Sequence, residues 1–564
     1  MVAPTRDELL RRHAALVSER SSFLEHWSDL AEQMLPRRFR RSTSERNAAF
    51  AGRKRNDKVV NNVARIAART LASGMHAGMT SPARPWFKLT TIDPDLSAFG
   101  AAKSWLSEVE ERMRLVFARS NLYTALPTLY ADLGVFGSAA LAVFDDADAV
   151  INCVVWPAGS YCFANGANGR VATVHHEQSF TVEQLVETFG LENVSRRARA
   201  AWEAGRLYEW IETLHVVEPR LGADPTRADA LSMPFRSVWI ETRSGEAPTA
   251  LLAESGFAEK PVLGVRWNCV GEDAYGESPG MDALGDARAL QVLERRKAQA
   301  IDKLVNPPMV APSTLRAERA SLLPGDVTYV DAVQGGQAFR PAIEIPPEGV
   351  TVVGREIAEH ERRVNAAFYA DLFLMLTQLD TPQMTAREVV ERHEEKMLQL
   401  GPVIERTEDE LLDPLVDRVF GLMHRRGLLP EPPAEMQGKE LRVEYVSVLA
   451  AAQRLIGTSG VERLAGFVGN IYGAKPEILD VIDFDKAVED YASMLGVDPG
   501  IIVPADERRR IRDQRAQAEQ AAQAAQAAPA VNQAAQAAKT LSETDVNGDN
   551  ALARLLAARQ GGAI

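Results

Sequence analysis

The chain has 564 residues, enough for two to four structural units with sizeable hydrophobic cores. Its net charge of -13 argues against a dedicated surface for duplex DNA, because such affinity comes mainly from Lys and Arg that neutralise phosphates. Three cysteines without a CxxC spacing, no apolar run of about 18 to 20 residues and no secretory signal after Met1 favour a soluble protein made in a reducing cytosol, with no membrane partner.

The N-terminal segment is predicted to be largely helical. Thr5 and Glu8 have the spacing of a capping box, in which a hydroxyl and a carboxylate satisfy free amides at a helix start. We expect this helix to reach about residue 34, and further helices over about residues 59–79 and 101–120. A basic stretch after the first helix indicates contact with phosphate or an acidic neighbour, or else a solvated loop. It contains Arg37, Arg38, Arg40, Arg41, Arg46, Arg53, Lys54 and Arg55.

From Ser138 the pattern changes to short runs typical of β-strands. These runs cover residues 139–144, 150–156, 161–165, 170–180, 208–217, 235–242, 250–254 and 262–268. Asn165-Gly166 and Asn168-Gly169 are favoured in tight hairpins because both residue types tolerate positive φ. The block is therefore predicted to be an antiparallel α+β domain.

Two long amphipathic helices are predicted between Tyr275 and Leu379, on either side of a proline-punctuated insert. They cover about Met281 to Val305 and about Val353 to Leu379, and each would span roughly 35 to 40 Å. Their apolar stripes contain Leu290, Leu293, Ile301 and Leu304 in the first helix and Ile357, Val364, Phe368 and Leu372 in the second. Such a hairpin is either a wall element of a larger assembly, covered by neighbouring copies, or ordinary helix packing inside one globule.

The insert and the C-terminal third have weaker signals. Short runs at 327–330 and 339–345 predict a minimal hairpin or ribbon in the insert. Thr385 and Glu388 repeat the capping-box spacing, so a new helix is expected to start there and to continue past Pro402 to about residue 426. More helices are expected over about 440–495, and the Ala/Gln tract at 516–538 is either a disordered tail or a helix ordered by identical neighbours.

Motifs for catalysis and for metal binding are missing from the sequence. It contains no GxxxxGK[ST] phosphate loop and no GxSxG elbow, so we predict no enzyme activity, no catalytic residue and no cofactor. His175-His176 would point to opposite faces of a strand, and His393 lacks a partner histidine four residues on, so structural roles are favoured over metal ligation. The sequence indicates a mechanical protein.

Several phrases, correctly ordered over roughly residues 1 to 430, together resemble the head-to-tail connecting (portal) proteins of short-tailed, podovirus-type bacteriophages. They are Asn61-Asn to Leu71-Ala-Ser-Gly-Met75, Gly78-Met-Thr-Ser-Pro82, Pro85-Trp-Phe-Lys-Leu89, Asn121-Leu-Tyr123 leading to Phe136-Gly137, Tyr275-Gly-Glu-Ser-Pro279, and Thr385-Ala-Arg-Glu-Val389 with Arg392. No phrase decides the matter alone, but jointly they are specific. The sequence departs from the family at Glu277, where a basic residue is usual.

The resemblance implies the portal fold, α+β and mainly helical. Its parts would be an α/β wing (1–279), two stem helices (280–306 and 352–378), a small β-containing clip (307–351), a tunnel loop (379–384), a wing helix (385–435), a helical crown (436–504) and an Ala/Gln-rich C-terminal helix, barrel or tail (505–564). It also implies a ring of identical subunits, a dodecamer in the virion, whose neighbours would cover the apolar stripes of the stem.

The implied function is a channel at one capsid vertex for packaging and ejection of double-stranded DNA. The implied partners are the major capsid protein, the terminase large subunit, which would dock at the clip, and later tail adaptor or nozzle proteins. The residues that match the tunnel loop in position, and are expected to face DNA, are Gln378, Asp380, Thr381 and Gln383. A buried turn against the wing is the alternative for this loop.

Two other classes of protein compete with this interpretation. A helical scaffold or filament-forming protein would use the same long helices, but the Asn-Gly hairpins weigh against it. A nucleic-acid-processing enzyme is disfavoured by the missing motifs and by the net charge.

Overall fold

The computed structural model describes two units, Met1–Gly457 and Thr458–Ile564. The described residues are 5–41, 58–91, 100–223, 227, 229–243, 250–307, 309–310, 340–341, 346–377, 399–438 and 441–446 in the first unit, and 464, 467–468, 481, 483–488, 503, 507–520, 536 and 539 in the second. In the second unit, residues 484–488 and 507–520 are helical. All elements named below belong to the first unit.

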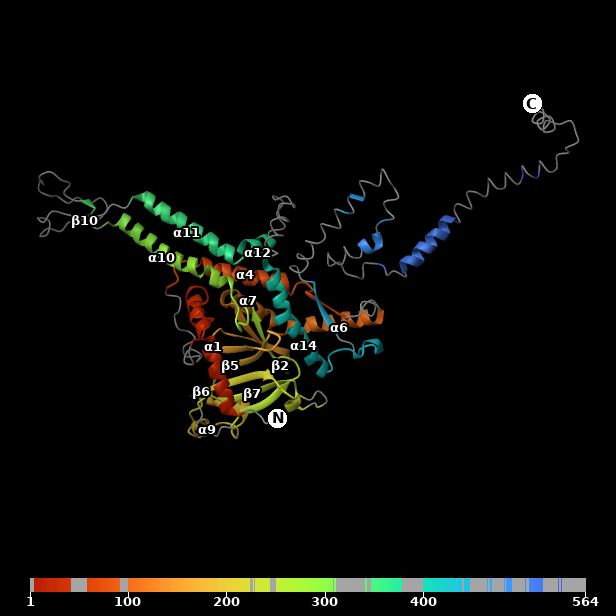
Figure 1. Cartoon of the computed structure of the whole chain (residues 1–564), viewed down its shortest axis with the longest axis horizontal. Coiled ribbons are helices and arrows are strands. Elements are labelled where there is room, and N and C mark those ends of the chain that lie inside the picture. The colour runs from red at the N-terminus through yellow and green to blue at the C-terminus, as the bar shows by residue number, and fades with distance from the viewer. Residues whose placement is uncertain are drawn as a thin grey trace, which may run out of the picture. The chain divides into compact units, whose positions relative to one another are not determined.

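Helix α1 (Arg6–Gln33) begins at the capping box that the sequence predicts. The Thr5 hydroxyl accepts a hydrogen bond from Glu8 N at 3.3 Å, and the Glu8 carboxylate accepts one from Thr5 N at 2.8 Å. The helix runs beside the β-sheets (Figure 1), and buried Arg20 donates to a main-chain carbonyl on β4, Tyr161 O, at 2.6 Å. Trp27 Nε1 donates to Phe136 O at 2.8 Å, so α1 is fastened along its length.

Three further helices follow α1 in the chain: α4 (Val63–Met79), α6 (Gly100–Arg119) and α7 (Leu122–Phe136). Helices α4 and α6 match the predicted helices, whereas α7 is not predicted. This helix has buried side chains around most of its circumference, so it lacks the one-sided apolar period by which a surface helix is detected. It also contains Pro127, at a position six residues after the N-cap Asn121, where proline usually argues against a helix.

Each of the eight predicted β-type runs overlaps a strand, the run at 250–254 only in its last two residues, and every pair of these strands is antiparallel. A three-stranded sheet has the order β3-β2-β9, and a five-stranded sheet has the order β4-β5-β6-β7-β8. The strands are β2 (Ser138–Asp146), β3 (Val150–Trp156), β4 (Tyr161–Asn165), β5 (Val171–Thr181), β6 (Trp210–Pro219), β7 (Phe235–Glu241), β8 (Ala253–Phe257) and β9 (Val262–Arg266). The Asn-Gly dipeptides form the β4–β5 turn, in which Gly169 has a φ of 73°.

Several short helices connect the strands or follow α14, and none of them is predicted from the sequence. They are α8 (Val182–Phe189), α9 (Arg196–Glu203) and the single turns η1 (Ala230–Ser232) and η4 (Ala434–Met436). Helices α8 and α9 share a small core of their own, which includes Val182, Leu185 and Ala198. Most other buried side chains belong to one large cluster that joins the long helices to the three-stranded sheet.

The two long predicted helices are present with changed boundaries. Helix α10 (Pro279–Val305) matches its prediction, whereas the second helix is divided into α11 (Pro347–Ala367) and α12 (Ala370–Thr377). The division lies at Tyr369, whose φ of 54° is incompatible with a right-handed helix. Two short strands, β10 (Met309–Val310) and β11 (Arg340–Pro341), pair between the helices, while the predicted run at 327–330 lies outside the described residues.

The helix predicted to pass Pro402 is confirmed from residue 399 onward, and it contains a π-helical turn, η3 (Glu408–Leu412), before α14 (Asp413–Arg425). The helical prediction that follows it is wrong at its start. Residues Leu441–Tyr445 form strand β12, which pairs with β1 (Phe87–Thr91). The period of two in Leu441, Val443 and Tyr445 is that of a strand. None of the described helices is long and apolar enough to cross a lipid bilayer.

Candidate functional site

The pair of helices α10 and α11 is the candidate functional element, and it extends side by side away from the sheets toward β10 (Figure 1). Ser278 caps α10: its hydroxyl accepts from Met281 N at 3.2 Å and donates to Val135 O at 2.7 Å. Asp286 on α10 bonds His360 Nδ1 on α11 at 2.6 Å. The base of the pair is therefore tied both to α7 and across its own seam.

Most of the predicted apolar stripe is covered by the chain itself. Leu290, Ile357, Val364, Phe368 and Leu372 are at most 4% exposed and belong to the large core cluster, in which α11 and α12 also contact α4. Leu293 is partly buried against the same cluster. This corrects the expectation that neighbouring copies cover these positions, because the burial of these side chains needs no second chain.

The same stripe is uncovered at the far end of the pair. Ile301 is 41% exposed and Leu304 is 43% exposed, and both lie in the last two turns of α10. Val305 and Val352 are also exposed and lie in the half of the pair nearest β10 and β11. We call Ile301, Leu304, Val305 and Val352 the distal patch. Of these residues, Ile301 and Leu304 belong to the predicted stripe, and they are its members that the described chain leaves exposed.

Charges on the helix pair balance. Helix α10 contains four Asp or Glu and five Lys or Arg, and α11 contains four and three, so the formal sum of the two helices is zero. Several charges are used in pairs, such as Arg362 with Glu359 at 2.8 Å. The pair therefore does not present the strongly cationic surface that binds duplex DNA tightly.

Two of the phrases that carry the family resemblance meet at one backbone crossing. Gly137 has a φ of 74°, and a Cβ there would lie 2.0 Å from Gly276 O. A Cβ on Gly276 would lie 2.5 Å from Gly137 O, and Gly276 N donates to the hydroxyl of Ser138 at 2.9 Å. Only glycine fits on either side. The crossing places the start of α10 beside the end of α7, directly before β2.

A third phrase meets the segment that leads out of α11. A Cβ on Gly74 of α4 would lie 2.1 Å from Cδ1 of Phe373 on α12, so glycine permits the close approach of these helices. The chain then enters residues 378–398, which lie outside the described residues. The predicted tunnel-loop residues Gln378, Asp380, Thr381 and Gln383, and the capping pair Thr385 and Glu388, are among them.

The described part of the basic stretch contacts its own chain. Arg38 Nε donates to both carboxylate oxygens of Asp132, at 2.9 and 3.2 Å, and Asp132 is 1% exposed. Burial raises the pKa of the Asp132 carboxyl, and the nearby guanidinium opposes that rise. The alternative of an acidic neighbour is therefore correct for Arg38. Residues 42–57 lie outside the described residues.

A buried ion pair connects the end of β9 to the π-helical turn. Arg266 is 2% exposed, and its Nη2 bonds Glu410 Oε1 at 2.5 Å. The guanidinium also donates to the carbonyls of Gly169 at 2.8 Å and Asp273 at 3.2 Å and to Asn165 Oδ1 at 3.2 Å. The pair thus fixes the helix that follows residues 378–398 onto both sheets.

His175 and His176 point to opposite faces of β5, as the sequence predicts. His175 stacks on His13 of α1 with ring centroids 5.5 Å apart, whereas His176 stacks on Trp156 at 3.7 Å. Burial lowers the pKa of His175 to about 3, and burial lowers that of His215 to about 3 as well. Within the residues described, no three His, Cys, Asp or Glu side chains come together as metal ligands would.

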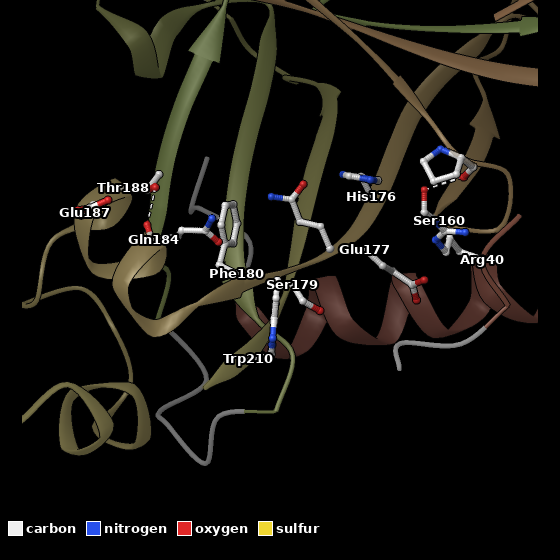
Figure 2. A pocket seen from close by; sticks show the side chains of 12 residues that line it. Arg40, Ser160, His176, Glu177, Ser179, Phe180, Gln184, Glu187, Thr188 and Trp210 are labelled. Atoms are coloured by element: carbon white, nitrogen blue, oxygen red, sulfur yellow. Dashed lines mark hydrogen bonds between the residues drawn. The ribbon is translucent and has the colours of Figure 1, made fainter. Parts of the chain in front are cut away.

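An open polar pocket of about 540 Å³ lies along β5 (Figure 2). It is lined by Arg40, Pro157, Ser160, His176, Glu177, Gln178, Ser179, Phe180, Gln184, Glu187, Thr188 and Trp210. The Ser160 hydroxyl donates to Pro157 O at 2.7 Å, and the Thr188 hydroxyl donates to Gln184 O at 2.7 Å. Both hydroxyls are thus committed to main-chain carbonyls instead of to a general base.

Comparison with known proteins decides the family. The sequence matches the family described as "Bacteriophage head to tail connecting protein" over residues 6–503. The chain belongs to this family. It is 46% identical over 559 residues to the portal protein of Salmonella phage epsilon15, with 99% of both chains covered. It is 44% identical over 508 residues to the probable portal protein of Bordetella phage BPP-1, with 90% of both chains covered.

The resemblance stated from the sequence is therefore confirmed, and the function is that of a phage portal protein, a structural component of the virion. A solved chain titled "Virion of native gene transfer agent (GTA) particle" is similar over 70% of this chain and 89% of its own. At 11% identity and a TM-score of 0.32, that similarity supports no structural argument.

Proposed function

We propose that identical copies of this portal protein close into a ring, a dodecamer in the virion, at one vertex of the capsid. The observation that supports ring closure in the structure is the distal patch. A stripe that is buried along most of α10 and α11 becomes exposed at Ile301 and Leu304, at 41% and 43%. Covering such side chains releases about 25 cal/mol per Å² of apolar surface, and a head-to-tail contact repeated around an axis covers them in every copy.

In this ring, residues 280–306 and 352–378 form the two stem helices, and residues 307–351 form the clip. Residues 1–279 with 385–435 form the wing. Residues 436–504 form the crown, and residues 505–564 form a C-terminal helix or tail. Gln378, at the end of the second stem helix, and Asp380, Thr381 and Gln383 in the loop at 379–384 face DNA. The zero formal charge of α10 and α11 and the net charge of -13 support low-friction passage of DNA, since neither favours tight phosphate binding.

The ring serves as the channel for packaging and ejection of double-stranded DNA. The terminase large subunit docks at the clip and supplies the energy, tail adaptor or nozzle proteins replace it, and the major capsid protein surrounds the wing. We infer no enzyme activity for the chain itself, because the sequence contains no GxxxxGK[ST] phosphate loop and the hydroxyls of Ser160 and Thr188 in the pocket along β5 donate to main-chain carbonyls. Ring assembly takes place in the host cytoplasm.

Electron microscopy of the purified chain tests the ring. We expect closed rings with an axial hole for the natural sequence, and folded monomers for a chain that carries Ile301→Glu and Leu304→Glu. Leu231→Glu is the matched control, because Leu231 is 55% exposed but lies beside the five-stranded sheet. Fibres, or rings that survive both stem substitutions, would refute the proposed role of the distal patch.

Deletion of residues 378–383 tests the channel loop separately. Rings should still form, while packaging or retention of the genome should fail in particles that carry the deletion. Particles with a normal amount of packaged DNA would show that these residues do not act on DNA.

A further inference from the structure

A hydrogen-bonded junction at residues 58–61 joins the helix pair to the rest of the unit. Gln291 on α10 is 5% exposed and lies at its centre. Its Oε1 accepts from Val60 N at 2.6 Å and from Asn61 N at 2.9 Å, and its Nε2 donates to Asn61 O at 2.9 Å. One side chain of α10 therefore holds the main chain of the segment that leads into α4.

Asn61 uses its own side chain to reach two further helices. Its Oδ1 accepts from Val63 N at 2.9 Å, at the first turn of α4. Its Nδ2 donates to Glu361 Oε1 on α11 at 2.9 Å and lies 3.4 Å from Glu294 Oε1 on α10. All four polar groups of Asn61 are thus used, and they connect α4, α10 and α11.

The residue type at this position follows from that geometry. Only an amide of this length combines an acceptor for Val63 N with a donor for Glu361. An aspartate in place of Asn61 would keep the acceptor but would place a carboxylate against Glu361 and Glu294. The sequence phrase that begins at Asn61-Asn62 therefore has a structural reason for its first residue: the Asn61 side chain joins α4 to α11.

Outer contacts at the junction are weaker. Arg295 Nη2 donates to Lys58 O at 2.8 Å, and Lys58 Nζ lies 2.5 Å from Glu32 Oε1 on α1. Arg288 on α10 pairs with Asp29 on α1 at 2.6 Å. The charged side chains of both ion pairs are between 39% and 65% exposed, and such pairs contribute about 0 to 1 kcal/mol. The specific part of the junction is therefore the contact between Asn61, Gln291 and Glu361.

We infer that the contact of Asn61 with Gln291 and Glu361 fixes the angle at which the helix pair joins the unit, and that this angle sets the number of subunits in the ring. The inference rests on the proposed ring. Closure requires a rotation of about 30° between neighbours for twelve copies, about 28° for thirteen and about 33° for eleven. The distal patch and the body of the subunit must both contact the neighbouring subunit at the same rotation. A change of a few degrees in the angle between the helix pair and the unit therefore favours a different number of subunits.

Substitution of Asn61 in the full-length chain tests the inference. Asn61→Asp leaves an acceptor for α4 and repels the carboxylate of Glu361, and the second substitution Glu361→Gln returns a donor to the pair. Asn62→Asp is the matched control, because Asn62 is exposed and its side chain makes no capping hydrogen bond. Native mass spectrometry of purified rings and their rotational symmetry in electron micrographs give the subunit count.

We expect one dominant count for the natural sequence and for Asn62→Asp. In Asn61→Asp, the ratio of that count to all other counts should fall about ten-fold, and it should recover in Asn61→Asp with Glu361→Gln. A folded Asn61→Asp chain whose rings keep the natural count and sharpness would overturn the inference. A role of Asn61 in folding alone would lower the melting temperature without changing the distribution of counts.

A second variant covers the case in which Asn61→Asp does not fold. Glu361→Ala removes only the acceptor on α11 and leaves Asn61 bonded to Gln291 and to α4, so its rings should also depart from the natural count. An unchanged count in this variant would overturn the inference. Absence of rings from the natural sequence would instead refute the proposed function, and with it this inference.

Discussion

Substitution of Arg266 by methionine should unfold the chain more readily than any surface change. The substitution keeps most of the side-chain volume but removes the cation from the buried carboxylate of Glu410, whose side chain is 5% exposed. A stranded buried charge costs about 3 to 5 kcal/mol. The lower figure of about 3 kcal/mol applies here, because Glu410 Oε2 still accepts from the main-chain N of residue 266 at 2.9 Å, and Arg406 lies 3.7 Å from Oε1.

The carbonyls of Gly169 and Asp273 also lose their guanidinium donors, at about 1 kcal/mol each. Arg266→Met should therefore lower the free energy of unfolding by about 5 kcal/mol. The pair Arg266→Met with Glu410→Leu should recover about 2 kcal/mol of that loss, because it removes the stranded carboxylate, worth about 3 kcal/mol, but also the acceptor of the main-chain N–H of residue 266, worth about 1 kcal/mol. Urea unfolding followed by tryptophan fluorescence measures both, with Ile301→Glu and Leu304→Glu in every chain so that ring contacts do not contribute. A double variant no more stable than Arg266→Met would refute the reasoning.

Three further changes test other parts of the structure. The free energy of unfolding should fall below about pH 6.5, because burial lowers the pKa of His175 and of His215 to about 3 in the folded state. Their contribution to stability is complete above the unfolded-state pKa of about 6.5 and is lost as the pH falls toward the folded-state pKa. Each histidine costs about 1.4 kcal/mol per pH unit, so His175→Phe should remove about half of the slope in urea unfolding, and an unchanged slope would contradict this. Gly74→Ala should cost about 1 to 3 kcal/mol by overpacking, since its Cβ would lie 2.1 Å from Cδ1 and 2.2 Å from Cγ of Phe373. The same substitution should cost less in a chain that already carries Phe373→Ala, where Cγ and Cδ1 are absent. Thr5→Ala removes the cap of α1 and should cost about 1 kcal/mol, with faster amide exchange confined to the first turn of that helix.

Local signals in the sequence are sufficient for most elements between residues 5 and 266. The capping box at Thr5 and Glu8 involves residues three apart, and the Asn-Gly turn joins neighbouring strands, so both are specified by short-range chemistry. Helix α7 escapes prediction because burial around most of its circumference removes the one-sided period. Strand β12 is predicted as helix although it alternates, because its partner β1 lies more than 300 residues earlier in the chain.

Periodicity predicts which face of each long helix is apolar but not which surface covers it. Leu290 and Ile301 belong to the same predicted stripe, yet one is 1% exposed and the other 41%. The difference depends on how far the core of the unit extends along α10, and that is set by tertiary packing. The junction at Asn61 cannot be predicted from the sequence either. Its partners Gln291 and Glu361 lie 230 and 300 positions later, so the sequence phrase can be noticed but not explained.

A single face of α10 serves both the fold and the proposed assembly. Ala283, Ala287 and Leu290 bury it at the base of the pair, and Ile301 and Leu304 expose it toward the insert. Rotation of α10 about its axis would move both sets together, so the core cannot be repacked without turning the distal patch. Gln291 lies on this helix between the two sets and bonds a segment outside the pair. The orientation of the distal patch is therefore fixed by the same contacts that complete the core, so folding of the subunit determines how the patch is presented to a neighbouring subunit.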